Sequence, residues 1–443
     1  MSPIGAAVRT RNVYLLAAAV VVGALLFAGR PARAEVSLVK TPDWELFTDG
    51  RVNAFVSYGW GDAYPLALHT QFPNEIGVTP GGGLDTEDNV IPRTDAAGNP
   101  VQGTFRSTRL RSGFLPNVFG LGLKWHLTAE TTLKVYVGLW MTIEAEGQRK
   151  FNNPFVFARE GYAKLEGPWG SFLAGRALDL FSRGATENDF LYGHGYGLGF
   201  PGNVNNTGPT AGMIGFGVLA AFFGAGLVYT TPGLAGLRLA VGLYDPAVIT
   251  GHYPVTREPL VESELTYDFG QGWFKLHLFG NGAYQNIYNG ATKVTMKGVG
   301  YGGRVELGNF HIGVAGHYGT GLGLNYALEN SATSISQNNE LRTFDGYSVI
   351  AQYVIGHVDI NAGWGVSRVF LLPDDRMAID NCNADGASCV SVIRRQMGYF
   401  GALVYHARPN LHFDIDYLRG DYAWFLGEKQ LVNFLNAGVT VTW

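Results

Sequence analysis

The chain has 443 residues, of which only 15% are charged, against about 25% in typical soluble domains. Glycine is abundant at 62 residues, and aromatic residues make up 13% of the chain. The formal net charge is −4, which excludes the strongly basic character of a nucleic-acid-binding protein.

The first 34 residues have the features of a secretory signal peptide. Two arginines precede an apolar run at 13–28, and Ala-Arg-Ala at 32–34 supplies small residues for cleavage. A retained anchor helix is the alternative, but the run is short for a membrane span and ends in Gly-Arg-Pro. We expect residues 1–34 to be removed, leaving 35–443 as one domain with a net charge of −8 that begins at Glu35.

The remainder of the chain alternates apolar and polar residues over many short segments. Within 131–144, for example, Leu133, Val135 and Val137 alternate with Lys134 and Tyr136. This period of two predicts strands whose two faces meet different surroundings. The predicted strands are 46–60, 105–127, 131–144, 157–166, 171–177, 213–230, 237–245, 257–269, 273–283, 297–308, 310–319, 342–355, 358–369, 394–407, 411–420 and 431–443.

Short turns and long loops alternate between these strands, as they do in outer-membrane barrels. No apolar run after the signal is long enough for a transmembrane helix. The fold class predicted is all-β, a transmembrane antiparallel β-barrel of about 16 strands. Since 105–127 and 213–230 are longer than one strand needs, counts of 14 and 18 stay open. A soluble sandwich also alternates, but it would not need so many small residues on its polar faces.

The segment 177–212 has no sustained strand or helix pattern. It carries Asp179, Glu187 and Asp189, followed by a run rich in glycine. A loop this long in a compact fold is usually functional or disordered, and its aromatic content argues against simple disorder. We expect it to fold into the barrel lumen and narrow the pore.

Several motifs resemble the general trimeric porins of Gram-negative bacterial outer membranes. Residues 45–54 look like the first strand of that family, 107–110 like the start of its second, and 159–176 like the hairpin before its constriction loop. The final strand, which ends on Trp443, is similar as well. Where the family often has a Pro-Glu-Phe-Gly-Gly-like run in the third loop, this chain has Asn-Asp-Phe-Leu-Tyr-Gly at 188–193.

The resemblance implies a homotrimer in the outer membrane, in contact with lipid and lipopolysaccharide. It also implies pore acids on the third loop, here Asp179, Glu187 and Asp189, facing a basic cluster on the barrel wall. The basic candidates are Arg51, Arg109, Arg111, Lys124, Lys134, Arg159 and Arg176. Facing charges of opposite sign would create a field across the pore and set its ion preference. Ordinary polar lining of a wet lumen is the alternative interpretation for each of them.

Other candidate sites favour ordinary structural roles. Cys382 and Cys389 lie in a predicted outer loop of an exported chain, so we expect a disulfide between them. Asp374 and Asp375 are expected to be solvated residues of the same loop. Five histidines on predicted polar faces have no convincing metal-ligand spacing: His126, His277, His311, His317 and His412.

The function predicted from these observations is passive diffusion of small hydrophilic solutes and ions, with no catalytic step, cofactor or metal. A channel selective for sugars, phosphates or carboxylates is the main alternative, and Tyr136, Trp140 and Phe190 would be candidates for its track. A membrane-embedded hydrolase is disfavoured because no G-x-S-x-G motif is present. An adhesin or structural barrel would require a sealed lumen.

Overall fold

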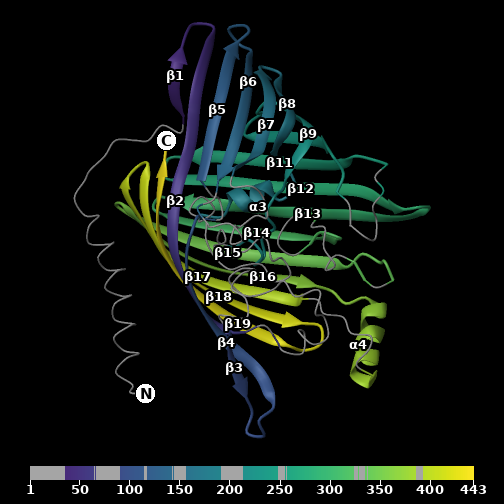
Figure 1. Cartoon of the computed structure of the whole chain (residues 1–443). Coiled ribbons are helices and arrows are strands. Elements are labelled where there is room, and N and C mark those ends of the chain that lie inside the picture. Colours follow the sequence, from purple (N-terminus) through teal and green to yellow (C-terminus); the bar gives the residue numbers. More distant parts are fainter. Residues whose placement is uncertain are drawn as a thin grey trace.

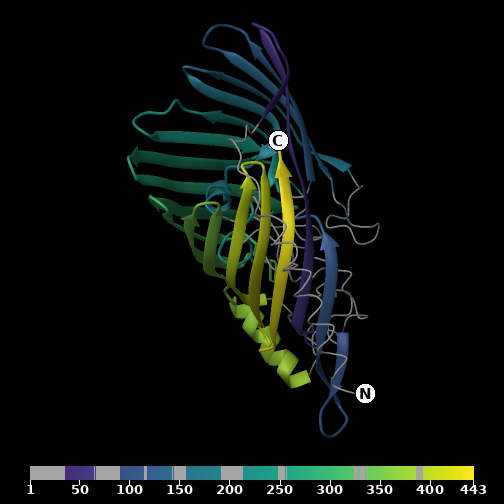
Figure 2. The ribbon, with the colours of Figure 1, turned by 90° about the vertical axis from the view of Figure 1, so that its left-hand side faces the viewer.

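The computed structural model describes residues 35–63, 65, 90–113, 117–141, 143, 156–190, 213–247, 255, 257–323, 328, 335–336, 338–385 and 393–443. Its strands form one antiparallel sheet that closes on itself, because the last strand pairs with β2. The result is a closed barrel of 16 strands, which confirms the predicted fold class and strand count. Figures 1 and 2 show the barrel wall curving around the short helix α3.

One strand of the barrel is made of two pieces. The long strand β2 pairs with β4 over one half of its length and with β5 over the other half. The barrel strands in chain order are β2 (Trp44–Asp62), β4 (Pro100–Arg111) with β5 (Asn117–His126), β6 (Thr132–Met141), β7 (Val156–Gly167), β8 (Gly170–Leu178), β9 (Phe223–Thr230), β10 (Leu237–Tyr244), β11 (Leu260–Gln271), β12 (Phe274–Asn289), β13 (Thr292–Leu307), β14 (Phe310–Thr320), β15 (Thr343–Ile355), β16 (Val358–Val369), β17 (Ile393–Arg408), β18 (Leu411–Trp424) and β19 (Lys429–Thr442).

Most predicted strand bounds differ from the structure by a few residues, and some differences are larger. The segment 105–127 is the two-piece strand, while 213–222 is not strand at all and only β9 remains of the predicted 213–230. Two short strands, β1 (Val36–Lys40) and β3 (Val90–Thr94), were not expected; they pair with β2 and β4 respectively. The segment 213–222 is apolar because it is buried inside the barrel, and not because it faces lipid.

The alternation in sequence has the expected physical outcome. Val135 and Val137 are more than two-fifths exposed on the outer surface, whereas Tyr136 between them is 6% exposed. The same pattern holds in β10, where Leu239, Val241 and Leu243 are exposed. The barrel therefore has an apolar outside and an inward face on which packing and polar contacts are made.

Glycines on the inward face make room for aromatic rings from the neighbouring strand. A Cβ added to Gly122 would lie 2.1 Å from Cζ of Phe47, and one added to Gly438 would lie 1.7 Å from Cδ1 of Phe55. Both phenylalanines are 0% exposed. Part of the high glycine content thus allows rings to lie flat on the inside of the wall.

The helix α4 (Pro373–Asp385) and the β3–β4 hairpin both project at the lower part of Figures 1 and 2. Asp375 at the start of α4 accepts hydrogen bonds from Nε and Nη2 of Arg342 at 2.9 and 2.6 Å. Both residues are 1% exposed, so the expectation of a solvated Asp375 is wrong. None of the helices in the described part of the chain is long and apolar enough to cross a membrane.

Candidate pore constriction

The segment after β8 turns into the lumen at Asp179. Its backbone N–H donates to the carbonyl of Phe222 at 2.8 Å, and its carboxylate accepts the N–H of Gly224 at 2.7 Å. The outgoing and returning ends of the segment are therefore held together where they leave the wall. A Cβ on Gly224 would lie 2.4 Å from the Asp179 carboxylate, so this close contact requires glycine.

The next residues attach to acids on β11. The N–H of Phe181 donates to Glu262 at 2.8 Å, and the guanidinium of Arg183 forms an ion pair with Glu264. These residues open the single-turn helix α3 (Arg183–Glu187), and Gly184 of that helix lies directly against the ring of Phe279 on β12. Sequence reasoning did not identify Glu262 and Glu264 as anchors, although two acids at alternate positions of one inward face were a visible signal.

Beyond α3 the segment reaches the adjacent strands of the wall. The side-chain amide of Asn188 donates to the carbonyls of Gly303 on β13 and Val314 on β14, at 3.1 and 3.0 Å. Asp189 accepts the N–H of Met213 at 2.7 Å, which joins the two described parts of the loop. The residues between them, 191–212, lie outside the described residues, as does the glycine-rich run at 197–202.

The returning segment 213–222 packs against the strands β15 to β18. Phe216 lies against Gly398 and the ring of Tyr422, and the N–H of Gly217 donates to Oγ of Ser367 at 2.9 Å. Gly217 has φ +90, and a Cβ there would lie 2.2 Å from the carbonyl of Tyr347. Leu180, Phe181, Ile214 and Leu219 are 0% exposed. The apolar character of 213–222 thus comes from packing inside the lumen, and the expected inward fold of the loop is confirmed.

The three acids predicted to face the pore have different environments. Asp179 and Asp189 are 5% and 6% exposed and serve as acceptors for backbone N–H groups. Glu187, at the end of α3, is exposed. Burial raises the pKa of Asp179 to about 8, with the nearby Glu262 carboxylate acting in the same direction. Partial desolvation by the surrounding protein raises the pKa of Glu187, while the charge of Arg183 acts in the opposite direction.

The basic candidates are not gathered at one place. The guanidinium of Arg159 lies against the rings of Trp140 and Phe223, with its carbon 4.6 and 4.8 Å from their centroids. Arg51 and Arg159 both interact electrostatically with Glu160 on β7. Lys124 and Lys134 form ion pairs with Glu35 near the short β5–β6 turn, away from the loop.

The remaining basic candidates lie elsewhere or cannot be described at the side-chain level. Arg176 follows Phe172 by four residues on β8, and the pairing of β8 with β7 is regular between them, so the two residues are on the same face of the strand. Phe172 is exposed on the outer face, and the strand position of Arg176 is therefore on that face too. Arg109 and Arg111 are in register with Ser57 and Phe55 of β2, and their side chains lie outside the described residues.

Two of the aromatic residues considered for a solute track, Trp140 and Tyr136, are packed into the wall. Trp140 is 4% exposed and meets Phe223 edge to face, and the hydroxyl of Tyr136 donates to Asp49 at 2.8 Å. The ring of Phe190 lies 6.0 Å from that of His311. Within the described residues no group of three or more His, Cys, Asp or Glu side chains is arranged to hold a metal ion. Cys389 lies outside the described residues, so its disulfide with Cys382 stays a prediction.

Comparison with known proteins defines the class. A family model described as Gram-negative porin matches residues 16–375, and the chain therefore belongs to the Gram-negative porin family. Family and fold are those of channels rather than enzymes, and they make the protein an outer-membrane β-barrel that serves as a diffusion channel.

Solved structures with the same fold are distant in sequence. The outer membrane channel DcaP of Acinetobacter baumannii matches at a TM-score of 0.61 and 12% identity, over 94% of this chain and 100% of that chain. An anion-selective porin from Comamonas acidovorans matches at 0.53 and 12% identity, over 90% and 100%. OmpT, an outer membrane protein of Vibrio cholerae, matches at 0.51 and 11% identity, over 92% and 100%. A comparison with curated proteins finds no match.

Proposed function

We propose that the loop segments 179–190 and 213–222 form the constriction of this diffusion channel, and that Glu187 is the loop carboxylate that sets its ion preference. The observation that carries the proposal is the set of hydrogen bonds and ion pairs between the loop and β11 to β17. These contacts hold the loop across the lumen, so solutes pass between it and the remaining wall. The size limit of the channel follows from that gap.

Glu187 is singled out by exposure. Asp179 and Asp189 are buried and hydrogen-bonded to backbone, so their charges face protein, whereas Glu187 faces water. A carboxylate at a narrow place with low-dielectric surroundings concentrates cations more strongly than one on an open surface. Arg51 and Arg159, which both interact electrostatically with Glu160, would oppose it, with Asp49 and Glu160 reducing their effect.

The test is the reversal potential of single channels in a planar bilayer under a salt gradient. The variant Glu187→Gln is expected to shift the reversal potential toward anion preference, and the shift should shrink as salt rises because screening increases. Asp380→Asn removes an exposed acid on the outer helix α4 and serves as the control. Equal shifts in both variants would refute the role of Glu187, and a folded protein without conductance would refute the channel.

The packed rings of Trp140 and Tyr136 favour passive diffusion over an aromatic track for sugars. We further propose the homotrimer, which rests on the family resemblance and on apolar outward residues available for packing.

A further inference from the structure

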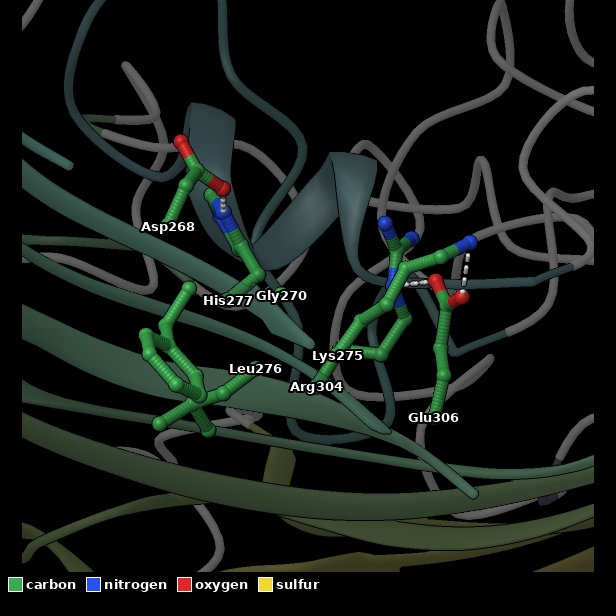
Figure 3. A pocket seen from close by; sticks show the side chains of 8 residues that line it. Asp268, Gly270, Lys275, Leu276, His277, Arg304 and Glu306 are labelled. Atoms are coloured by element: carbon green, nitrogen blue, oxygen red, sulfur yellow. Dashed lines mark hydrogen bonds and ion pairs between the residues drawn. The ribbon is translucent and has the colours of Figure 1, made fainter. Parts of the chain in front are cut away.

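A cavity of about 270 Å³ opens on the inward face of β11, β12 and β13, near the short turns at their ends (Figure 3). Its polar lining consists of Asp268, Lys275, His277, Arg304 and Glu306, and Gly270 leaves space beside Lys275. None of these residues belongs to the loop that forms the constriction.

The strand register arranges these side chains in two rows across the sheet. Asp268, His277 and Arg304 are directly opposed on neighbouring strands and make the first row. Gly270, Lys275 and Glu306 make the second. Since neighbouring strands are about 4.8 Å apart, the backbones of Asp268 and Arg304 are separated by about 10 Å.

The charges divide into a negative and a positive end. At one end Asp268 accepts a hydrogen bond from Nδ1 of His277 at 2.7 Å, and its side chain remains 54% exposed. At the other end Glu306 forms ion pairs with Lys275 at 2.9 Å and Arg304 at 3.2 Å. Glu306 is 19% exposed, while Lys275 and Arg304 are 66% and 33% exposed. One carboxylate shared by two cations leaves a net positive charge facing the cavity.

We infer that this cavity is a binding subsite for small zwitterionic solutes of amino-acid size. The carboxylate of the solute would bind Lys275 and Arg304, and its ammonium would bind Asp268. A solute with a single charge is attracted at one end of the cavity and repelled at the other, whereas a zwitterion of matching length is attracted at both.

The subsite lies beside the constriction, and its role in permeation rests on the proposed function. Asn188 of the loop binds the carbonyl of Gly303, the residue before Arg304, and Gly184 of α3 packs on Phe279, two residues after His277. Glu187 interacts electrostatically with both His277 and Arg304. A zwitterion leaving or approaching the constriction would thus meet the subsite directly.

The experiment measures solute-induced noise and block of the single-channel current of the full-length protein. The probes are glycine, β-alanine and γ-aminobutyrate, in which the two charges move progressively apart, together with butyrate and butylammonium. We expect γ-aminobutyrate to bind most tightly, because its charge separation best fits the two ends. Asp268→Asn and Arg304→Gln should each weaken its binding by about tenfold or more, the effect of one charge-assisted hydrogen bond.

The control is Lys164→Gln, which removes an inward cation of β7 that is likewise paired with a carboxylate, Glu166, at 2.7 Å. It should leave the binding of γ-aminobutyrate unchanged. Butyrate binding as tightly as γ-aminobutyrate would overturn the inference in favour of a simple anion site. A normally conducting channel with no zwitterion-dependent noise would overturn it as well, while loss of all conductance would instead count against the proposed channel.

Discussion

At the scale of single residues, carboxylates close together in the loop do different things because their surroundings differ. Asp179 is buried beside Glu262, Asp189 binds a backbone N–H, and Glu187 is open to water. A buried acid holds its proton to higher pH, since burial penalises the charged form, and Arg176 offsets only part of this effect at Asp179. The root of the loop should therefore respond to pH.

The sign of that response follows from linkage. The pKa of Asp179 is raised from 3.8 to about 8, so between these values the folded protein keeps a proton that the unfolded chain releases. The free energy of unfolding should fall as pH rises through this window and change no further, on this account, above about pH 8. Asp179→Asn keeps an acceptor for Gly224 and should flatten the dependence. Thermal melts at pH 5 and pH 8 measure it, and an unchanged slope in the variant would contradict the assignment.

At the scale of elements, the outer end of the barrel is held by buried polar contacts. Arg342 precedes β15 and binds Asp375 of α4, and the N–H of Leu372 also donates to Asp375 at 3.0 Å. Asp375→Asn would leave the guanidinium of Arg342 buried without its charge partner, which typically costs about 3–5 kcal/mol. We expect faster hydrogen exchange in α4 with unchanged conductance. Asp380→Asn on the same helix is the control, and equal protection in both variants would contradict this role.

The predicted disulfide belongs to the same element. Cys382 lies in the last part of α4, and Cys389 follows a few residues beyond it. The loop that a disulfide would close is short, so we expect a stabilisation of about 2–3 kcal/mol. Intact-mass analysis with alkylation before and after reduction decides the matter: two thiols labelled in the unfolded, unreduced protein would show that no bridge exists.

Sequence was most informative about elements and least informative about side-chain direction within the loop. The alternation of apolar and polar residues predicted the observed bounds of β16 (Val358–Val369), because one face of a barrel strand meets lipid and the other meets the lumen. The apolar run 213–222 was predicted to be a strand, because a segment packed inside the lumen has the same apolar composition as a strand packed in a sheet. Nothing local distinguishes Asp189, bound to an N–H 24 residues later, from the exposed Glu187. For Arg176, by contrast, the strand alternation alone predicts the outer face, since Arg176 is four residues after the apolar Phe172. The family resemblance implied a position facing the pore, and that implication is wrong.

At the scale of the whole molecule, the outer face bears apolar residues on the strands that close the barrel. Val52, Val56 and Val441 are 51%, 48% and 40% exposed on β2 and β19. Such a face can be covered by lipid or by another copy of the chain. We expect native mass spectrometry in mild detergent to show three chains per particle, and a monomer at every protein concentration would exclude the trimer.

The one-sided attachment of the loop has a consequence for the use of this barrel as a nanopore sensor. The hydrogen bonds and ion pairs described here attach the loop to strands from β11 to β17, while Trp140 on β6 and Arg159 on β7 contact Phe223 at its root. Inward side chains of β5, which is involved in none of these contacts, are therefore the ones to exchange for a reporter group without disturbing the attachment of the loop. When a polymer passes through the gap, the current would be determined chiefly by the part of the polymer beside the single helical turn of α3. Because that turn is short and held by the wall, few monomers would contribute to the signal at a time.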